Sequence, residues 1–220
     1  MSVAAGLDTL VHRVRPARAE PAGALVLLHG RGVDEGDLFP VLDELDPQAR
    51  LLGASPRAPL TLPPGGNHWY IVQRVGFQHR ETFMHSFELL TQWLAALADD
   101  SGVPWERTVI GGFSQGAVMA YALALGAGRP APAGLLAMSG FIPEVDGFDL
   151  DLERPGLPMA ITHGTLDPII GVQFARAARQ RLEAAGNRLL YRESPVGHGI
   201  DPRVLTDLRE WLRAAIDLAA

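Results

Sequence analysis

The 220-residue chain contains no cysteine, and this absence removes three kinds of chemistry at once. It excludes disulfide bonds, thiolate zinc sites and a cysteine nucleophile. It also fits a reducing compartment, where proteins do not rely on disulfides. A domain of this length buries roughly 70% of the surface that its unfolded chain exposes, so its core needs no covalent cross-link.

The sequence also lacks a basic patch and a long apolar run. Its net charge is −6, and its 19 basic residues other than histidine are arginines scattered among acids, unlike the clustered cations of nucleic-acid-binding proteins. The longest apolar run, residues 117–127, is too short to span a bilayer. Residues 1–14 have no apolar signal-peptide core. We therefore expect one cytoplasmic domain over residues 1–220, with no nucleic-acid partner and no membrane insertion.

Short apolar runs that alternate with helical patterns predict an α/β fold with a mostly parallel central sheet and helices on both faces. Continuous apolar runs are typical of strands that are buried on both sides. The expected strands are residues 24–28, 50–54, 108–111, 134–138 and 158–162, with a weaker sixth at 187–191 and an antiparallel edge strand over 7–14.

Helical periodicity and capping residues predict the elements between these strands. Two loops, residues 55–77 and 139–158, are long and rich in proline and glycine, and loops of that length in a compact domain are often functional. The expected helices are residues 81–98, 117–127, 172–185 and a last one that begins with Asp201 as N-cap and Pro202 at its first position.

Residues 112–116 read Gly-Phe-Ser-Gln-Gly and lie between an expected strand and an expected helix. This is the G-x-S-x-G pattern in the strand–turn–helix context that it requires. A sharp turn lifts the serine hydroxyl above the sheet, and only small residues fit two positions before and after it. The alternative is a chance match in a chain with 24 glycines, which the flanking strand and helix disfavour. Ser114 is the predicted nucleophile.

A second glycine-rich segment, residues 29–32 (His-Gly-Arg-Gly), follows the first buried strand. Acyl hydrolysis places a negative charge on the former carbonyl oxygen, and two main-chain N–H groups must already point at it. In this type of site, one belongs to the residue after the nucleophile and the other to a loop after an early strand. Gln115 and Arg31 are the predicted donors, and His29 is expected to hold the loop.

Chain order selects the base among seven histidines, because Ser, then Asp or Glu, then His is the order in α/β-hydrolases. Only His163 and His198 follow Ser114, and His163 comes before any suitable acid. His198 lies between two glycines just before the last helix, and it is the predicted general base.

The acid that orients this base should follow a strand at the same sheet edge. Asp167 comes just after the strand that ends near residue 162, so it is the predicted acid. Three rivals crowd a polar loop and are interpreted as solvated surface residues: Asp146, Asp149 and Asp151.

With these motifs in this order, the chain resembles the carboxylesterase/acyl-protein thioesterase (phospholipase/carboxylesterase) family of α/β-hydrolases. The resemblance runs from about residue 22 to the C-terminus and is most specific at residues 112–116. It implies an α/β-hydrolase fold and cleavage of carboxyl esters or thioesters through an acyl-enzyme, without a cofactor. It also suggests the same oxyanion donors, Arg31 and Gln115.

The substrate is expected to be a small ester or thioester with a short- to medium-chain acyl group. For each of the residues expected to contact the substrate, a role in core or loop packing is an equally good interpretation. The Arg31 side chain is a candidate contact for an anionic group on the substrate. No metal site is expected, because the histidines and arginines of residues 68–85 lack carboxylate partners. The expected contacts are Trp69, Tyr70, Phe141, Ile142, Ile169 and Ile170.

Other functions remain open at this point. An acyltransferase, or a perhydrolase that uses peroxide, would share the same triad and acyl-enzyme. A non-catalytic α/β binding module would keep the fold, but it predicts a damaged triad. The sequence leaves the oligomeric state open.

Overall fold

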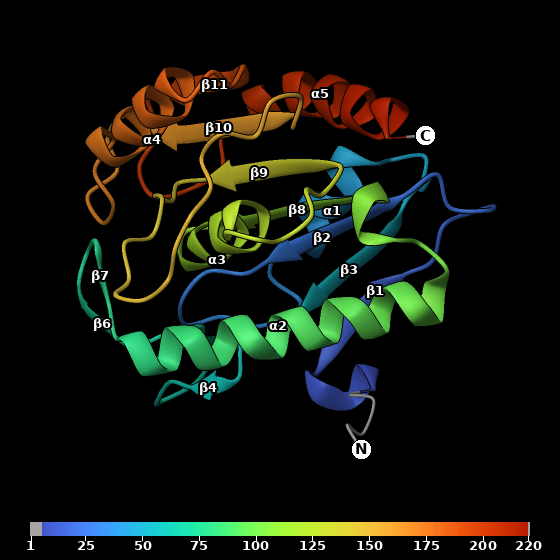
Figure 1. The fold of residues 1–220 in the computed structure, drawn as a ribbon, viewed down its shortest axis with the longest axis horizontal. Coiled ribbons are helices and arrows are strands. Elements are labelled where there is room, and N and C mark those ends of the chain that lie inside the picture. Colours follow the sequence, from blue (N-terminus) through green and yellow to red (C-terminus); the bar gives the residue numbers. More distant parts are fainter. Residues whose placement is uncertain (1–5, 220) are drawn as a thin grey trace.

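The computed structural model describes residues 6–219, which build one seven-stranded sheet in the order β1-β3-β2-β8-β9-β10-β11 (Figure 1). Every neighbouring pair in it is parallel except β1 with β3, so the predicted antiparallel edge strand is confirmed. The strands are β1 (His12–Arg15), β2 (Ala24–Leu28), β3 (Leu52–Pro56), β8 (Thr108–Phe113), β9 (Gly134–Met138), β10 (Met159–Gly164) and β11 (Leu189–Ser194).

Five α-helices within residues 6–219 cover the two faces of the sheet (Figure 1). Side chains of α2, α3 and α4 join one apolar cluster, and those of α1 and α5 join another on the opposite face. The expected α/β fold with helices on both faces is therefore confirmed. The helices are α1 (Phe39–Leu45), α2 (Arg80–Ser101), α3 (Gln115–Leu125), α4 (Gln173–Ala184) and α5 (Leu205–Leu218).

The α3 helix is buried along its whole length, which explains why it lacks a polar face. It starts two residues before the expected position and packs against β8 and β9 in the centre of the sheet. A helix surrounded by protein has no solvent side to keep polar. Its N-terminus is consequently fixed at the carboxyl edge of the sheet.

Several expectations about the elements need correction. Residues Leu7–Thr9 form a 3₁₀ helix that packs on α2, and they are not part of the edge strand. The strands expected at 50–54 and 187–191 begin two residues later, and the short helix α1 was not expected. The loop 55–77 contains short paired strands: β4 (Leu60–Thr61) with β5 (Asn67–His68), and β6 (Val72–Arg74) with β7 (Phe77–Gln78).

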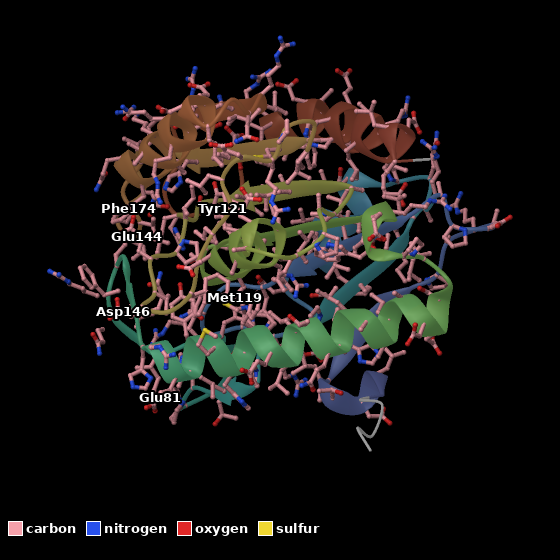
Figure 2. All side chains as sticks on the ribbon, in the orientation of Figure 1. Glu81, Met119, Tyr121, Glu144, Asp146 and Phe174 are labelled. Carbon is pink, nitrogen blue, oxygen red and sulfur yellow. The ribbon has the colours of Figure 1, made fainter. Side chains whose placement is uncertain are left out.

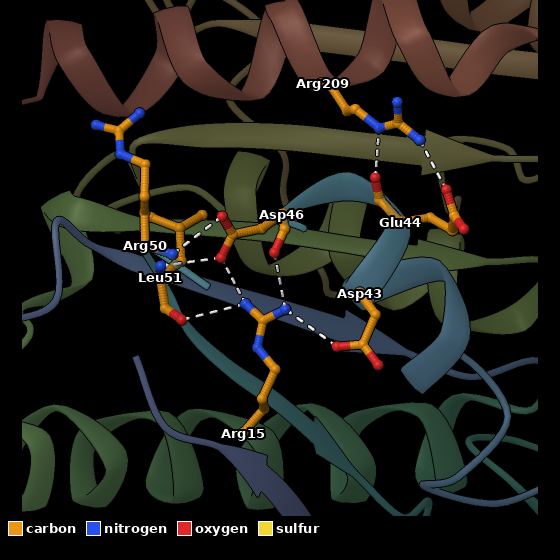
Figure 3. A network of polar contacts seen from close by, with 7 residues as sticks. All are labelled: Arg15, Asp43, Glu44, Asp46, Arg50, Leu51 and Arg209. Carbon is orange, nitrogen blue, oxygen red and sulfur yellow. Dashed lines mark hydrogen bonds and ion pairs between the residues drawn. The ribbon is translucent and has the colours of Figure 1, made fainter. Parts of the chain in front are cut away.

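A polar network ties the edge strand β1 to the end of α1 (Figure 3). The guanidinium group of Arg15 donates to the carboxylate of Asp46 and to the carbonyl oxygen of Leu51. The carboxylate of Asp46 also accepts the main-chain N–H groups of Arg50 and Leu51. Both ionic side chains are largely buried, with 15% of Arg15 and 8% of Asp46 exposed. Asp46 thus connects the edge strand, α1 and the turn into β3.

We expect Asp46→Asn to lower the free energy of unfolding by about 2 to 4 kcal/mol, because it removes the buried counter-charge of Arg15 and leaves that guanidinium only the exposed carboxylate of Asp43. Glu44→Gln is the matched control, since Glu44 pairs with Arg209 at the surface and this change should shift the free energy by less than about 1 kcal/mol. Urea unfolding followed by circular dichroism measures both. Equal losses in the two variants would contradict the importance of the buried network.

Within residues 6–219, no helix has both the length and the apolarity needed to cross a bilayer.

Candidate active site

Ser114 lies at the turn between β8 and α3 with φ 56° and ψ −117°, a backbone conformation that is strained for a residue with a side chain. The glycines on either side of it make this turn possible. A β-carbon on Gly116 would lie 1.9 Å from the carbonyl oxygen of Leu28, and one on Gly112 would lie 2.4 Å from the carbonyl carbon of Gly116. The turn therefore has room only for glycine at these two positions.

Three loops at the carboxyl ends of β8, β10 and β11 bring Ser114, Asp167 and His198 together. The hydroxyl oxygen of Ser114 is 2.9 Å from Nε2 of His198, and Nδ1 of His198 is 2.6 Å from Oδ2 of Asp167. The ring of Phe113 packs against the imidazole at 4.8 Å between centroids. The predicted nucleophile, base and acid thus form one continuous hydrogen-bonded chain.

Asp167 is held as a carboxylate by donors on both of its oxygens. Its Oδ1 accepts the main-chain N–H groups of Ile169 and Ile170, at 2.8 and 2.9 Å. Burial alone would raise the pKa of Asp167, but the hydrogen bonds from His198, Ile170 and Ile169 outweigh it, and the pKa is lowered. An ionised Asp167 accepts a hydrogen bond from the Nδ1–H of His198, and this tautomer leaves the Nε2 lone pair facing the hydroxyl of Ser114.

His163 lies beside this carboxylate. The order of residues in the sequence excludes it as the base and indicates no other role for it. Its buried Nε2 donates to the carbonyl oxygen of Ile170 at 2.7 Å and is 3.5 Å from Oδ2 of Asp167. Burial is the largest influence on the His163 imidazole and lowers its pKa, so the ring is neutral and carries its proton on Nε2. His163 thereby holds the turn whose N–H groups bind Asp167, a contact that residue spacing alone does not reveal.

The expected oxyanion loop is tied down by His29, as its position suggested. Nε2 of His29 accepts the N–H of Ala58 at 2.9 Å, so Nδ1 carries the proton and donates to the carbonyl oxygen of Gly30 at 2.7 Å. Burial lowers the pKa of His29, which keeps the ring neutral in this role. The loop is therefore rigid next to Arg31.

The side chain of Gln115 fastens the neighbouring segment. Its Oε1 accepts the main-chain N–H of Trp69 and its Nε2 donates to the carbonyl oxygen of Tyr70, both at 2.8 Å. As the first residue of α3, Gln115 keeps a main-chain N–H that the helix itself does not use. Arg31 and Gln115 both line the cleft that contains Ser114.

This cleft has a volume of about 490 Å³ and is bounded by the β6–β7 hairpin on one side. Four of the six expected substrate contacts line it: Tyr70, Phe141, Ile169 and Ile170. Sequence reasoning missed the contribution of the hairpin, because short strands inside a long loop have too few residues to show a pattern. The hairpin residues that line the cleft are Val72, Arg74, Val75 and Phe77.

Trp69 and Ile142 do not line the cleft, contrary to expectation. The Trp69 side chain is fully buried, and its Nε1–H donates to the carbonyl oxygen of His29 at 2.9 Å. This hydrogen bond holds the indole against the oxyanion loop. Ile142 lines a separate cavity of about 240 Å³. Phe141 lies between this cavity and the cleft and lines both.

A larger cavity of about 810 Å³ lies on the other side of the hairpin. Glu144, Asp146 and Phe174, which line it, are labelled in Figure 2 on the same side of the molecule as β6 and β7 in Figure 1. No group of three or more histidine and acidic side chains within residues 6–219 is arranged to hold a metal ion.

The sequence profile of the phospholipase/carboxylesterase family matches residues 11–216 of this chain. Acyl-protein thioesterase 1 of Candida albicans is 27% identical over 92% of this chain and 96% of its own length. The fold is similar to that of the Bacillus cereus carboxylesterase, with a TM-score of 0.82, 23% identity and 94% of each chain covered. Esterase PE8 gives a TM-score of 0.80 and 26% identity over 94% of this chain and 99% of its own.

The family profile covers the sheet, both helical layers and all three loops that meet at Ser114. The chain therefore belongs to the phospholipase/carboxylesterase family of α/β-hydrolases and is a serine hydrolase of the esterase and thioesterase type.

Proposed function

We propose that the protein cleaves carboxyl esters or thioesters through an acyl-enzyme on Ser114, with His198 as general base and acid and Asp167 as its orienting carboxylate. The observation that carries this proposal is the hydrogen-bonded chain from the Ser114 hydroxyl through both nitrogens of His198 to Asp167. The strained backbone at Ser114 supports it, because strain of this kind is maintained where a side chain must be presented.

The first half of the reaction transfers the acyl group to the enzyme. The hydroxyl oxygen of Ser114 attacks the acyl carbon while Nε2 of His198 takes its proton. The N–H groups of Arg31 and Gln115 stabilise the negative oxygen of the tetrahedral intermediate. Collapse of the intermediate breaks the bond to the alcohol or thiol, and His198 returns the proton to that leaving group.

The second half restores the enzyme with water. His198 removes a proton from a water molecule as its oxygen attacks the acyl-enzyme carbonyl carbon. The second intermediate breaks the bond to Ser114, which regains its proton from His198, and the carboxylic acid leaves. No step needs a group beyond the side chains and N–H donors named here, so we propose a reaction without a cofactor.

Short- to medium-chain acyl groups fit the volume and lining of the cleft. A volume of about 490 Å³ suits a small substrate, and Tyr70, Phe141 and Ile170 provide an apolar wall. The ring of Phe141 separates this space from the next cavity and packs on Phe174 at 5.3 Å between centroids. We infer that Phe141 limits the length of the acyl chain.

We expect Phe141→Ala to shift the preferred acyl chain toward longer homologues, because it joins the cleft to the cavity of about 240 Å³. The measurement is kcat/KM across 4-nitrophenyl esters from acetate to decanoate. A Phe141→Leu variant, which keeps most of the wall, should move the optimum less. An unchanged chain-length profile in Phe141→Ala would show that this side chain does not bound the acyl site.

The test of the proposed function is the hydrolysis of 4-nitrophenyl butyrate and of a butyryl thioester by wild-type protein and by Ser114→Ala. We expect turnover in the wild type and a loss of about 10⁴-fold or more in the variant, because no other group replaces the nucleophile. Retained turnover in Ser114→Ala would refute the proposal. Adding alcohol, amine or peroxide acceptors to the same assay tests for acyl transfer, which would compete with hydrolysis for the same acyl-enzyme.

We further propose that the whole chain acts as one domain, since both apolar clusters pack on a single sheet. Limited proteolysis that yields no stable fragment would agree with this.

A further inference from the structure

The charge of the cleft differs from that of the protein. The chain has a net charge of −6, yet the cleft around Ser114 is lined by two arginines, Arg31 and Arg74, and by no carboxylate. A partly enclosed cleft with charges of one sign concentrates the electrostatic field inside it. The cleft therefore attracts anions in a molecule that repels them on average.

These two arginines also differ from most others in the chain. Within residues 6–219, ten arginines lie 3.5 Å or less from a carboxylate oxygen, but neither Arg31 nor Arg74 does. The side chains of both residues are exposed at the mouth of the cleft. A guanidinium group that no protein carboxylate neutralises is available to a ligand.

The position of the Arg74 guanidinium is set by the hairpin that carries it. Arg74 and Phe77 are paired across β6 and β7, and the guanidinium carbon lies 3.5 Å from the centroid of the Phe77 ring. Stacking on an aromatic face restricts the arginine without using its N–H donors. Its donors thus stay free to bind an oxyanion from a fixed position.

We propose that the substrate carries a carboxylate or phosphate group in addition to its acyl bond, and that Arg31 and Arg74 bind this anionic group. The planar donor fork of arginine fits both anions in bidentate geometry. The inference rests on the proposed function, since it names the class of ester or thioester that the same site selects. It makes Arg31 and Arg74 specificity-determining residues, with a role for the Arg31 side chain that is separate from that of its main-chain N–H.

Two matched substrate pairs test the proposal. The first compares 4-nitrophenyl hydrogen adipate with 4-nitrophenyl hexanoate and places the anion on the acyl group. The second compares butyryl-4′-phosphopantetheine with butyryl-pantetheine and places it on the leaving group. The readout is the ratio of kcat/KM for the anionic member to that for the neutral member, normalised to hydroxide-catalysed hydrolysis. The pair with the larger ratio shows which side of the scissile bond carries the anion.

In the wild type we expect a ratio of about 10 or more in at least one pair, because an arginine–anion contact is charge-assisted. Arg31→Gln and Arg74→Gln should each lower this ratio, and the double variant should bring it close to about 1. The ratio cancels any effect of the substitution on the oxyanion loop. Raising the ionic strength should also lower it, since salt screens exposed charges.

Arg213→Gln is the matched control, because Arg213 is an exposed arginine on α5, outside the cleft and without a carboxylate partner among the described residues. It removes the same charge and should leave the ratio unchanged. Wild-type ratios near 1 in both pairs, or a ratio that survives the double variant, would overturn the proposal while hydrolysis of the neutral esters continues. Absence of hydrolysis of every substrate would instead refute the proposed function.

Discussion

Asp167→Asn should reduce kcat/KM for ester hydrolysis by about 10³- to 10⁴-fold while the protein stays folded. An asparagine can present its amide group to Nδ1 of His198 and so stabilise the tautomer whose Nε2 carries the proton. That tautomer cannot accept the proton of Ser114. The variant also removes the negative charge that stabilises the imidazolium, and steady-state kinetics with 4-nitrophenyl butyrate measures the loss.

The matched control for this variant is Asp201→Asn. Asp201 is a buried carboxylate three residues after His198, and it accepts the N–H of Arg203 at the start of a 3₁₀ helix. The hydrogen-bond partners of the His198 ring are Asp167 and Ser114, whereas Asp201 caps a helix, so its replacement should act on stability and change kcat/KM by no more than about threefold. Equal losses in the two variants would contradict the specific role of Asp167.

Gly116→Ala should lower the free energy of unfolding by about 3 kcal/mol or more and remove activity. The added methyl group would lie 1.9 Å from the carbonyl oxygen of Leu28 and 2.6 Å from that of His29, and these are backbone atoms at the carboxyl end of β2. To relieve the clash, α3 must move away from β2, and this displaces both Ser114 and the oxyanion loop. Urea unfolding and ester hydrolysis on the same preparation measure both effects.

Gly65→Ala is the control for the glycine substitution. A β-carbon at Gly65 meets nothing within 4 Å, so the change should alter stability by less than about 1 kcal/mol. If Gly116→Ala unfolded at the same urea concentration as Gly65→Ala and kept its activity, the tight packing of the turn at Ser114 would not be required.

The central sheet was predictable because its strands are buried on both faces and therefore read as continuous apolar runs, as in residues 24–28. The order of Ser114, Asp167 and His198 was readable for a related reason, since each follows a strand of a parallel sheet and so lies at its carboxyl edge. These signals are local, and the topology of the fold then brings the three residues within hydrogen-bonding distance.

Other features depend on tertiary contacts that no local pattern encodes. The indole of Trp69 is placed beneath the oxyanion loop by a hydrogen bond to His29, forty residues away in sequence. The neutral His163 is held by its hydrogen bond to the carbonyl oxygen of Ile170. Its separation of four residues from Asp167 in the sequence is equally compatible with an ion pair. In the β6–β7 hairpin, Val72 pairs with Gln78 across a turn. The surrounding loop has too few apolar residues in sequence to predict these strands.

Reaction with a fluorophosphonate probe tests the central claim most directly, because only an activated serine attacks its phosphorus atom. The proposed mechanism predicts a single adduct by intact mass in the wild-type protein, located on Ser114 by peptide mapping and absent from Ser114→Ala. It also predicts much slower labelling of Asp167→Asn, since the base then loses its orienting carboxylate. A folded wild-type protein that forms no adduct, or one labelled at a different serine, would contradict the assignment of Ser114 as the nucleophile.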